Sequence, residues 1–196
     1  MSIQPKERTL SGWRDCIVVL MDLIGIKTRV LKGDSAASTL MRSFHELVRH
    51  EMTGGFGALH HAYVWNDSVL LLAYVDSRAS VCEKAMRAAE DLKRKVDVVA
   101  PSYAVAVQGQ AFPSHSGFKN NRVTVIKASS YAMANCFEIE AEARRRKLTK
   151  RSWYVDIRIV RHVPAALADE YLKVSLLPTG KFRRVYVHTG YLWSRA

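Results

Sequence analysis

The first concentrated apolar run of this chain extends from Ile17 to Asp22, and only its last residue carries a charge. Such a run predicts a buried strand. Apolar residues then recur at helical spacing over about 35–50, which predicts an amphipathic helix with Asp34 or Ser35 as its N-cap. An ionised carboxylate at the end of a buried strand is expensive unless a cation compensates it. Asp22 is therefore the first candidate for chemistry.

The next segments predict a hairpin, a helix and a strand. Two β-rich runs, 58–65 and 68–75, are separated by the pair 66–67 (Asn-Asp), which favours a tight turn. Ser77 caps a second amphipathic helix, and 103–107 predicts another strand. The order β-α-β-β-α-β is that of ferredoxin-like domains, with an antiparallel sheet and both helices on one face. In that arrangement the end of the first strand and the hairpin turn meet at one sheet edge.

Beyond this core, the pattern predicts a C-terminal helix and a β-strand extension. Residues 113–121 are polar and predict a loop, and a helix follows at about 129–147. Short strands are expected near 153–157, 172–176 and 183–188. The predicted fold class is therefore α+β, a ferredoxin-like βαββαβ core of the palm type with this extension. No repeat or linker is evident, so residues 1–196 are expected to form one domain.

Composition places the chain among ordinary globular proteins, with 48% hydrophobic and 24% charged residues. No apolar stretch approaches the roughly 20 residues that a membrane-spanning helix requires, and the N-terminus does not resemble a secretory signal. A cytoplasmic location without membrane attachment is expected. The three cysteines, Cys16, Cys82 and Cys136, are far apart in apolar or helical surroundings, which favours reduced core thiols over disulfides or zinc ligands.

Two carboxylates at one sheet edge repel each other unless a divalent cation lies between them. Magnesium is suited to this, because it takes only one or two protein carboxylates while phosphate oxygens and water complete its shell. Asp22 and Asp67 thus predict a metal site that acts on a phosphate-bearing substrate. The alternative is that Asp67 is simply a turn residue and that Asp22 ends its strand in solvent.

Two segments resemble class III nucleotide cyclases. Val19–Lys27 is similar to their opening strand and turn, and Tyr63–Leu70 is similar to their hairpin, although Asn66 stands where a glycine is usual. With the matching order of elements, the resemblance extends over about 15–190. It implies a homodimer in which both subunits build each active site, and a reaction that cyclises a nucleoside triphosphate and releases pyrophosphate.

The resemblance also implies roles for individual residues. Asp22 and Asp67 would be catalytic metal ligands, with the carbonyl of Leu23 as a third ligand. Two Mg²⁺ or Mn²⁺ ions would occupy each active site. The backbone around Ile26 would face the triphosphate, as exposed N–H groups in a turn can.

The departures from the family pattern concern the base and the transition state. Tyr63 stands where adenylate and guanylate cyclases place a Lys or Glu that reads the base, and an aromatic there shortens the pocket and favours a pyrimidine. Asn135 can take the role of the usual catalytic Asn with a shift of one residue. No Arg follows it four residues later, so Arg144, Lys127 and Arg122 remain candidates for stabilising the transition-state charge.

The segment Cys136–Glu140 resembles the small bacterial cyclases of the Pycsar antiphage systems, which make cyclic CMP or cyclic UMP. The resemblance implies a uridylate or cytidylate cyclase whose product is read by a separate effector. Lys181, in the basic segment 178–184, lies where cyclases keep a phosphate-binding Lys.

Two other functions fit parts of the pattern. The chain has 30 Lys and Arg against 18 Asp and Glu, a net charge of +12, which attracts nucleic acid as well as triphosphates. A ferredoxin-like RNA-binding module is the first alternative, but the first strand lacks the aromatics that such sheets display, so nucleic acid is not the expected partner. The second is a degenerate cyclase that binds nucleotide without catalysis.

Overall fold

The α+β fold expected from the sequence is confirmed in a computed structural model of the chain, which describes residues 6–9, 13–53, 61–75, 79–117, 124–145, 153–156, 159, 171–174 and 185–188. The helices are α1 (Ile26–Leu31), α2 (Ser35–Thr53), α3 (Ala79–Val99) and α4 (Tyr131–Arg145). The strands are β1 (Lys6–Thr9), β2 (Arg14–Leu23), β3 (His61–Trp65), β4 (Ser68–Tyr74), β5 (Ser102–Gly117), β6 (Thr124–Ser130), β7 (Trp153–Asp156), β8 (Tyr171–Val174) and β9 (Val185–His188).

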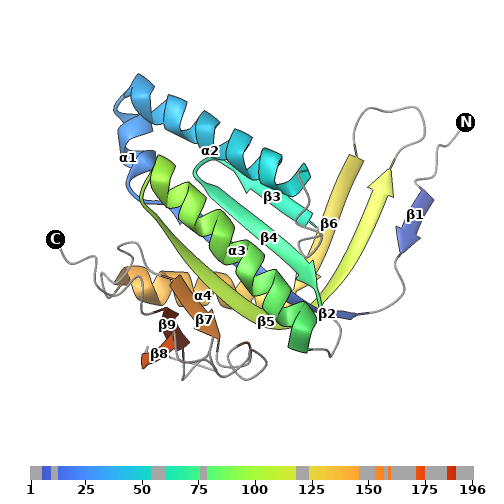
Figure 1. The fold of residues 1–196 in the computed structure, drawn as a ribbon. Helices are drawn as coiled ribbons and strands as arrows, with labels where there is room; N and C mark the ends of the chain where they lie inside the picture. Colours follow the sequence, from blue (N-terminus) through green and yellow to red (C-terminus); the bar gives the residue numbers. More distant parts are fainter. Residues whose placement is uncertain are drawn as a thin grey trace, which may run out of the picture.

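The sheet has the strand order β3-β4-β2-β5-β7-β9-β8, and its first four strands form the predicted ferredoxin-like core. β2 pairs antiparallel with β4 on one side and with β5 on the other. β7 adds parallel to β5 and begins the C-terminal extension. β1 and β6 pair with the far half of β5, and Figure 1 shows the β5–β6 hairpin projecting away from the helices.

Helices cover both faces of the central strands (Figure 1). Ile17, Val19 and Met21 of β2 pack in one core with α2 and α3. Val18 and Leu20 point to the opposite face, where they pack against α4. Because side chains alternate along a strand, a strand that is buried on both faces reads as a continuous apolar run. The one-sided helix layer predicted from the sequence describes α2 and α3, whereas α4 closes the second face.

The predicted loop at 113–121 is wrong over its first part, because β5 continues to Gly117. Residues Lys6 to Thr9 pair with one edge of this segment, and β6 pairs with the other. Backbone hydrogen bonds to two neighbours hold such a strand without apolar side chains, so its polar sequence did not indicate it. The short helix α1 was also missed, since one and a half turns are too few to show a helical period.

Helix α4 follows β6 directly, without a connecting loop. The Ser130 hydroxyl accepts hydrogen bonds from the backbone N–H groups of Ala132 at 3.0 Å and Met133 at 3.3 Å, and it donates to the carbonyl of Gln110 at 2.9 Å. A Cβ on Gly109 would lie 2.9 Å from the Ala132 Cβ, so α4 approaches β5 more closely than a larger residue permits. These contacts fix where α4 crosses the sheet.

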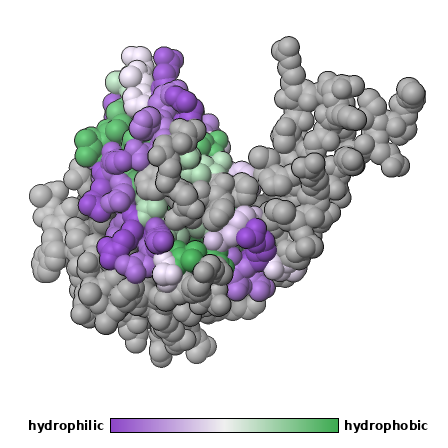
Figure 2. Space-filling model, turned by 45° about the vertical axis from the view of Figure 1, so that its right-hand side comes forward, coloured by the Kyte–Doolittle hydropathy of each residue, from purple (hydrophilic) through white to green (hydrophobic). Residues whose placement is uncertain are grey.

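The remaining features agree with the sequence pattern. Asp34 is the N-cap of α2, since its Oδ1 accepts hydrogen bonds from the Ala36 and Ala37 amides, whereas the predicted cap Ser77 lies outside the described residues. All three cysteines are buried and free of disulfides. Among the described helices, none is both long and apolar enough to cross a bilayer. On the face seen in Figure 2, hydrophobic residues form small patches among hydrophilic ones.

Candidate functional site

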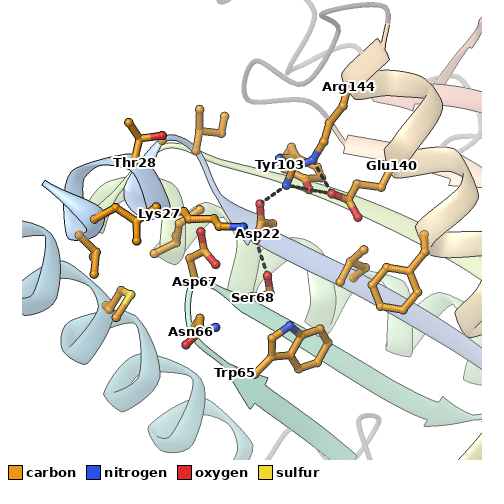
Figure 3. A pocket seen from close by; sticks show the side chains of 18 residues that line it. Asp22, Lys27, Thr28, Trp65, Asn66, Asp67, Ser68, Tyr103, Glu140 and Arg144 are labelled. Atoms are coloured by element: carbon orange, nitrogen blue, oxygen red, sulfur yellow. Dashed lines mark hydrogen bonds and ion pairs between the residues drawn. The ribbon is translucent and has the colours of Figure 1, made fainter.

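The two aspartates singled out from the sequence meet at one edge of the sheet. Asp22 is the residue before the last of β2 and pairs with Ser68, and Asp67 occupies the two-residue turn that precedes Ser68. Asn66 takes the left-handed conformation that this turn requires, with φ 48°. The backbone N–H of Leu23 donates to the carbonyl of Asp67 at 2.8 Å, which ties the turn to the end of β2. Both aspartates line a pocket of about 700 Å³ (Figure 3).

The carboxylate of Asp22 is almost fully buried, with 8% of its side chain exposed. The Ser68 hydroxyl donates a hydrogen bond to Oδ1, and Nη2 of Arg144 donates to Oδ2 at 2.7 Å. Burial raises the pKa of Asp22 to about 6; the Ser68 hydrogen bond and Arg144 oppose this, and the charge of Asp67 adds to it. Asp22 is therefore a carboxyl group that would gain from a further positive charge.

Arg144 reaches Asp22 from the last turn of α4, and Figure 3 shows the contact. Its Nε donates to Glu140 Oε1 at 2.5 Å, and its Nη2 also donates to the Tyr103 hydroxyl at 2.8 Å. That hydroxyl donates to the same Glu140 oxygen at 2.5 Å. Burial and the hydrogen bond to Glu140 raise the pKa of Tyr103, so the phenol stays protonated and can donate. Three groups thus hold one guanidinium against the carboxylate.

The structure distinguishes among the cations that sequence reasoning left open. Arg144 lies in the pocket. Lys127 belongs to β6, opposite Ser114, and Arg122 lies outside the described residues. Ser68, Tyr103 and Glu140 were not predicted as site residues. The strand register could have indicated Ser68 and Tyr103, because both pair directly with Asp22. The position of Glu140 depends instead on where α4 crosses the sheet.

A basic side chain and two aromatic rings complete the pocket wall. Lys27 extends toward the two carboxylates in Figure 3, beside Thr28 of the same short helix. Trp65 of β3 and Phe137 of α4 are 38% and 44% exposed, so part of each ring faces the pocket solvent. The other lining residues are Leu20, Leu23, Ile24, Gly25, Val30, Leu31, Met41 and Asn66.

Several predicted site residues lie away from this pocket in the described part of the chain. Ile26 is 2% exposed and packs in the core beneath α2 and α3. Tyr63 packs against the core on the α4 face, and burial raises the pKa of its hydroxyl. Asn135 is half-buried on α4 and does not line the pocket. Leu23 does line it, and Lys181 falls outside the described residues.

A buried ion pair fixes the start of β5 beside the pocket. Lys93 of α3 is fully buried and donates to Asp97 Oδ2 at 2.7 Å and to the Ser102 carbonyl at 3.0 Å. Asp97 Oδ1 accepts hydrogen bonds from the Ser102 backbone N–H at 3.0 Å and from its hydroxyl at 2.7 Å. The residue after Ser102 is Tyr103, which pairs with Asp22. The cluster therefore helps to position Tyr103 against the carboxylate.

The donor groups fit magnesium or manganese bound together with a phosphate ligand. Asp22 and Asp67 supply two carboxylates, and among the described residues no hydrogen bond or ion pair reaches the Asp67 carboxylate. Within those residues, no group of three or more His, Cys, Asp or Glu side chains is arranged so that it could hold a metal ion. Mg²⁺ commonly binds through one or two carboxylates and takes its remaining ligands from substrate and water.

Comparison with known proteins places the fold. No protein-family model and no curated protein matches the sequence. Solved structures do match: the adenylate cyclases of Trypanosoma brucei in their monomeric state superpose with a TM-score of 0.67 at 8% identity, covering 98% of this chain and 96% of that one. A bacterial light-regulated adenylyl cyclase gives 0.66 at 10% identity, with 92% of each chain covered.

The guanylate cyclase domain of RhGC from Catenaria anguillulae, solved in complex with GTP, gives a TM-score of 0.59 at 8% identity and covers 90% of this chain and 98% of that one. The chain therefore has the fold of class III adenylyl and guanylyl cyclase domains. At these identities the likeness establishes the fold, and the activity has to be argued from the site.

Proposed function

We propose that the chain is a nucleotidyl cyclase that converts a pyrimidine nucleoside triphosphate, UTP or CTP, into its 3′,5′-cyclic monophosphate and pyrophosphate. The observation that carries this proposal is the pair Asp22 and Asp67 at one edge of a cyclase-type sheet, lining a pocket of about 700 Å³. This volume lies within the range of small-molecule sites. The whole of residues 1–196 would then act as one cyclase domain.

The metal ions would be held by Asp22, Asp67 and the carbonyl of Leu23. When bound, they would lower the pKa of the 3′-hydroxyl and neutralise charge on the triphosphate. The 3′-oxygen forms a bond to the α-phosphorus, the bond from that phosphorus to pyrophosphate breaks, and the hydroxyl proton passes to water. Lys27 lines the pocket where it can bind the leaving phosphates, and Arg144 is the cation available for the transition state.

Aromatic side chains in the pocket offer surfaces for a nucleobase, and the pyrimidine preference rests on Tyr63. Trp65 and Phe137 offer two half-exposed rings within the pocket, and a base can stack on either. Tyr63 replaces the Lys or Glu that purine cyclases use to read the base. We propose that Tyr63 contacts the base in a homodimer with shared sites. Asn135 would take part in catalysis there, and Lys181 and the backbone at Ile26 would bind the substrate. The product would be read by a separate effector, as in antiphage signalling.

An RNA-binding module is less well supported than a cyclase. RNA-recognition sheets need an open face on their central strands. Here α2 and α3 cover one face of β2, and α4 covers the other.

The direct test incubates the protein with each of the four ribonucleoside triphosphates and Mn²⁺ or Mg²⁺, and identifies products by mass spectrometry. A cyclic pyrimidine nucleotide from the wild type, and none from Asp67→Asn, is the expected result. A cyclic purine product would refute the proposed substrate class. Nucleotide binding without any cyclic product would identify a degenerate cyclase, and the absence of both binding and product would refute the cyclase proposal altogether.

A further inference from the structure

Asp22 already has a cation of the protein itself as its partner. Its Oδ2 accepts the Nη2 hydrogen bond of Arg144 at 2.7 Å, while its Oδ1 accepts the hydrogen bond of Ser68. Asp67, across the pocket edge, has no such partner among the described residues. The two carboxylates therefore differ: Asp22 is hydrogen-bonded to a cation of the protein itself, and Asp67 is available to an incoming ion.

Both carboxylate oxygens of Asp22 already accept a hydrogen bond, so a metal ion that took Oδ2 as its ligand would meet the guanidinium of Arg144 there. Two cations at contact distance from one carboxylate repel each other, and the burial of Asp22 limits how well water screens them. We propose that Arg144 is a mobile substitute cation, which occupies Asp22 until metal displaces it and then turns toward the phosphates of the substrate. This rests on the proposed function for its second half, since only a phosphate ligand gives the displaced arginine a new partner.

The geometry allows Arg144 to move without leaving the site. Its side chain is 54% exposed, so its release from Asp22 does not strand a buried charge. The bond from Nε to Glu140 can persist as a pivot, because Glu140 lies one turn earlier on the same helix. A guanidinium has five N–H donors, and the Nη2 group that contacts Asp22 can exchange a carboxylate for a phosphate. When the hydrogen bond to Asp22 is broken, this donor is therefore free within the pocket.

The first experiment measures Mn²⁺ alone, without nucleotide, by its electron paramagnetic resonance signal or by calorimetry. Arg144→Met is expected to bind Mn²⁺ about fivefold tighter than the wild type, the upper range for a half-exposed ion pair. Arg145→Met is the matched control, because Arg145 is the next residue and pairs with Glu142 at 2.7 Å outside the pocket. Its Mn²⁺ affinity should be unchanged.

Two further variants separate direct competition from a general effect of positive charge. Arg144→Lys keeps the charge but lacks the fork that contacts Asp22, Glu140 and Tyr103 together, so its Mn²⁺ affinity should approach that of Arg144→Met. Lys27→Met removes another pocket cation for which no ion pair to Asp22 is found. It should tighten Mn²⁺ binding less than Arg144→Met. Equal tightening by both Met variants, or unchanged affinity in Arg144→Lys and Arg144→Met, would overturn the proposal.

Turnover measurements then test the second part of the proposal, the transfer of Arg144 to the phosphates. With saturating Mn²⁺ and nucleotide, Arg144→Met should lower kcat by about a hundredfold or more, as the loss of one transition-state donor does. Tighter metal binding together with slower turnover supports a displaced cation, whereas a kcat equal to that of the wild type refutes its transfer to the phosphates. If no variant makes a cyclic nucleotide while Arg144→Met still tightens Mn²⁺, the competition at Asp22 stands and the proposed function fails.

Discussion

Replacing Asp22 by Asn should stabilise the metal-free protein at neutral and alkaline pH. Burial raises the pKa of Asp22 from the ordinary 3.8 to about 6, so the fold favours the protonated carboxyl. The contribution that protonated Asp22 makes to the free energy of unfolding is fully present below about pH 4, and it is lost as the pH rises through 6. At about 1.4 kcal/mol per pKa unit, the ionised carboxylate costs about 3 kcal/mol at pH 8. For a chain of this length the gain in Tm is about 6–12 °C.

The assay is thermal unfolding in the presence of a chelator, followed by calorimetry between pH 4 and pH 8. The two proteins should melt together near pH 4, and Asp22→Asn should melt progressively later as the pH rises. Asp34→Asn is the control of opposite sign, because the hydrogen bond from Arg29 lowers the pKa of that exposed N-cap. An Asp22→Asn protein that melts at or below the wild type at pH 8 would refute the assignment of Asp22 as a buried, undercompensated carboxylate.

Four other outcomes follow from single contacts. Asp67→Asn should weaken Mn²⁺ binding at least about a hundredfold in calorimetry, with little change in Tm, and an unchanged affinity would exclude Asp67 as a ligand. Trp65→Ala should raise KM for the nucleotide about tenfold, with a smaller effect on kcat in steady-state assays. Gly109→Ala should destabilise the fold by about 1–3 kcal/mol in urea titrations, and Ala132→Gly in the same chain should restore part of the loss. Lys93→Met should lower the free energy of unfolding by about 3 kcal/mol and also lower activity, because the start of β5 is no longer fixed. An unaltered midpoint in urea titrations would contradict this.

The sequence was most informative where local pattern and topology agree. The apolar run before Asp22 and the Asn-Asp pair at 66–67 are enough to place both carboxylates at one sheet edge. This follows because strand pairing in a βαββαβ core leaves few arrangements open. The structure reproduces this juxtaposition through the pairing of Asp22 with Ser68.

The partners of Asp22 were harder to predict, because they come close to it only through the packing of elements that are far apart in the sequence. Arg144 is 122 residues from Asp22 along the chain, and it reaches the carboxylate only because α4 packs on the second face of the sheet. From the sequence alone, Arg144 is one of three candidate cations. The extension of β5 to Gly117 was missed for a related reason, since its polar residues are held by backbone pairing on both sides.

Because β6 and α4 join directly at Ser130, a small change of angle at this junction would displace the far end of the helix by a larger distance. From Ser130 to Arg144 the helix axis measures about 20 Å, so a tilt of about 3° at the junction moves the arginine by about 1 Å. A hydrogen bond of 2.7 Å to Asp22 does not survive such a displacement. A change in the β5–β6 hairpin that tilted α4 at Ser130 would therefore also disturb the ion pair between Arg144 and Asp22.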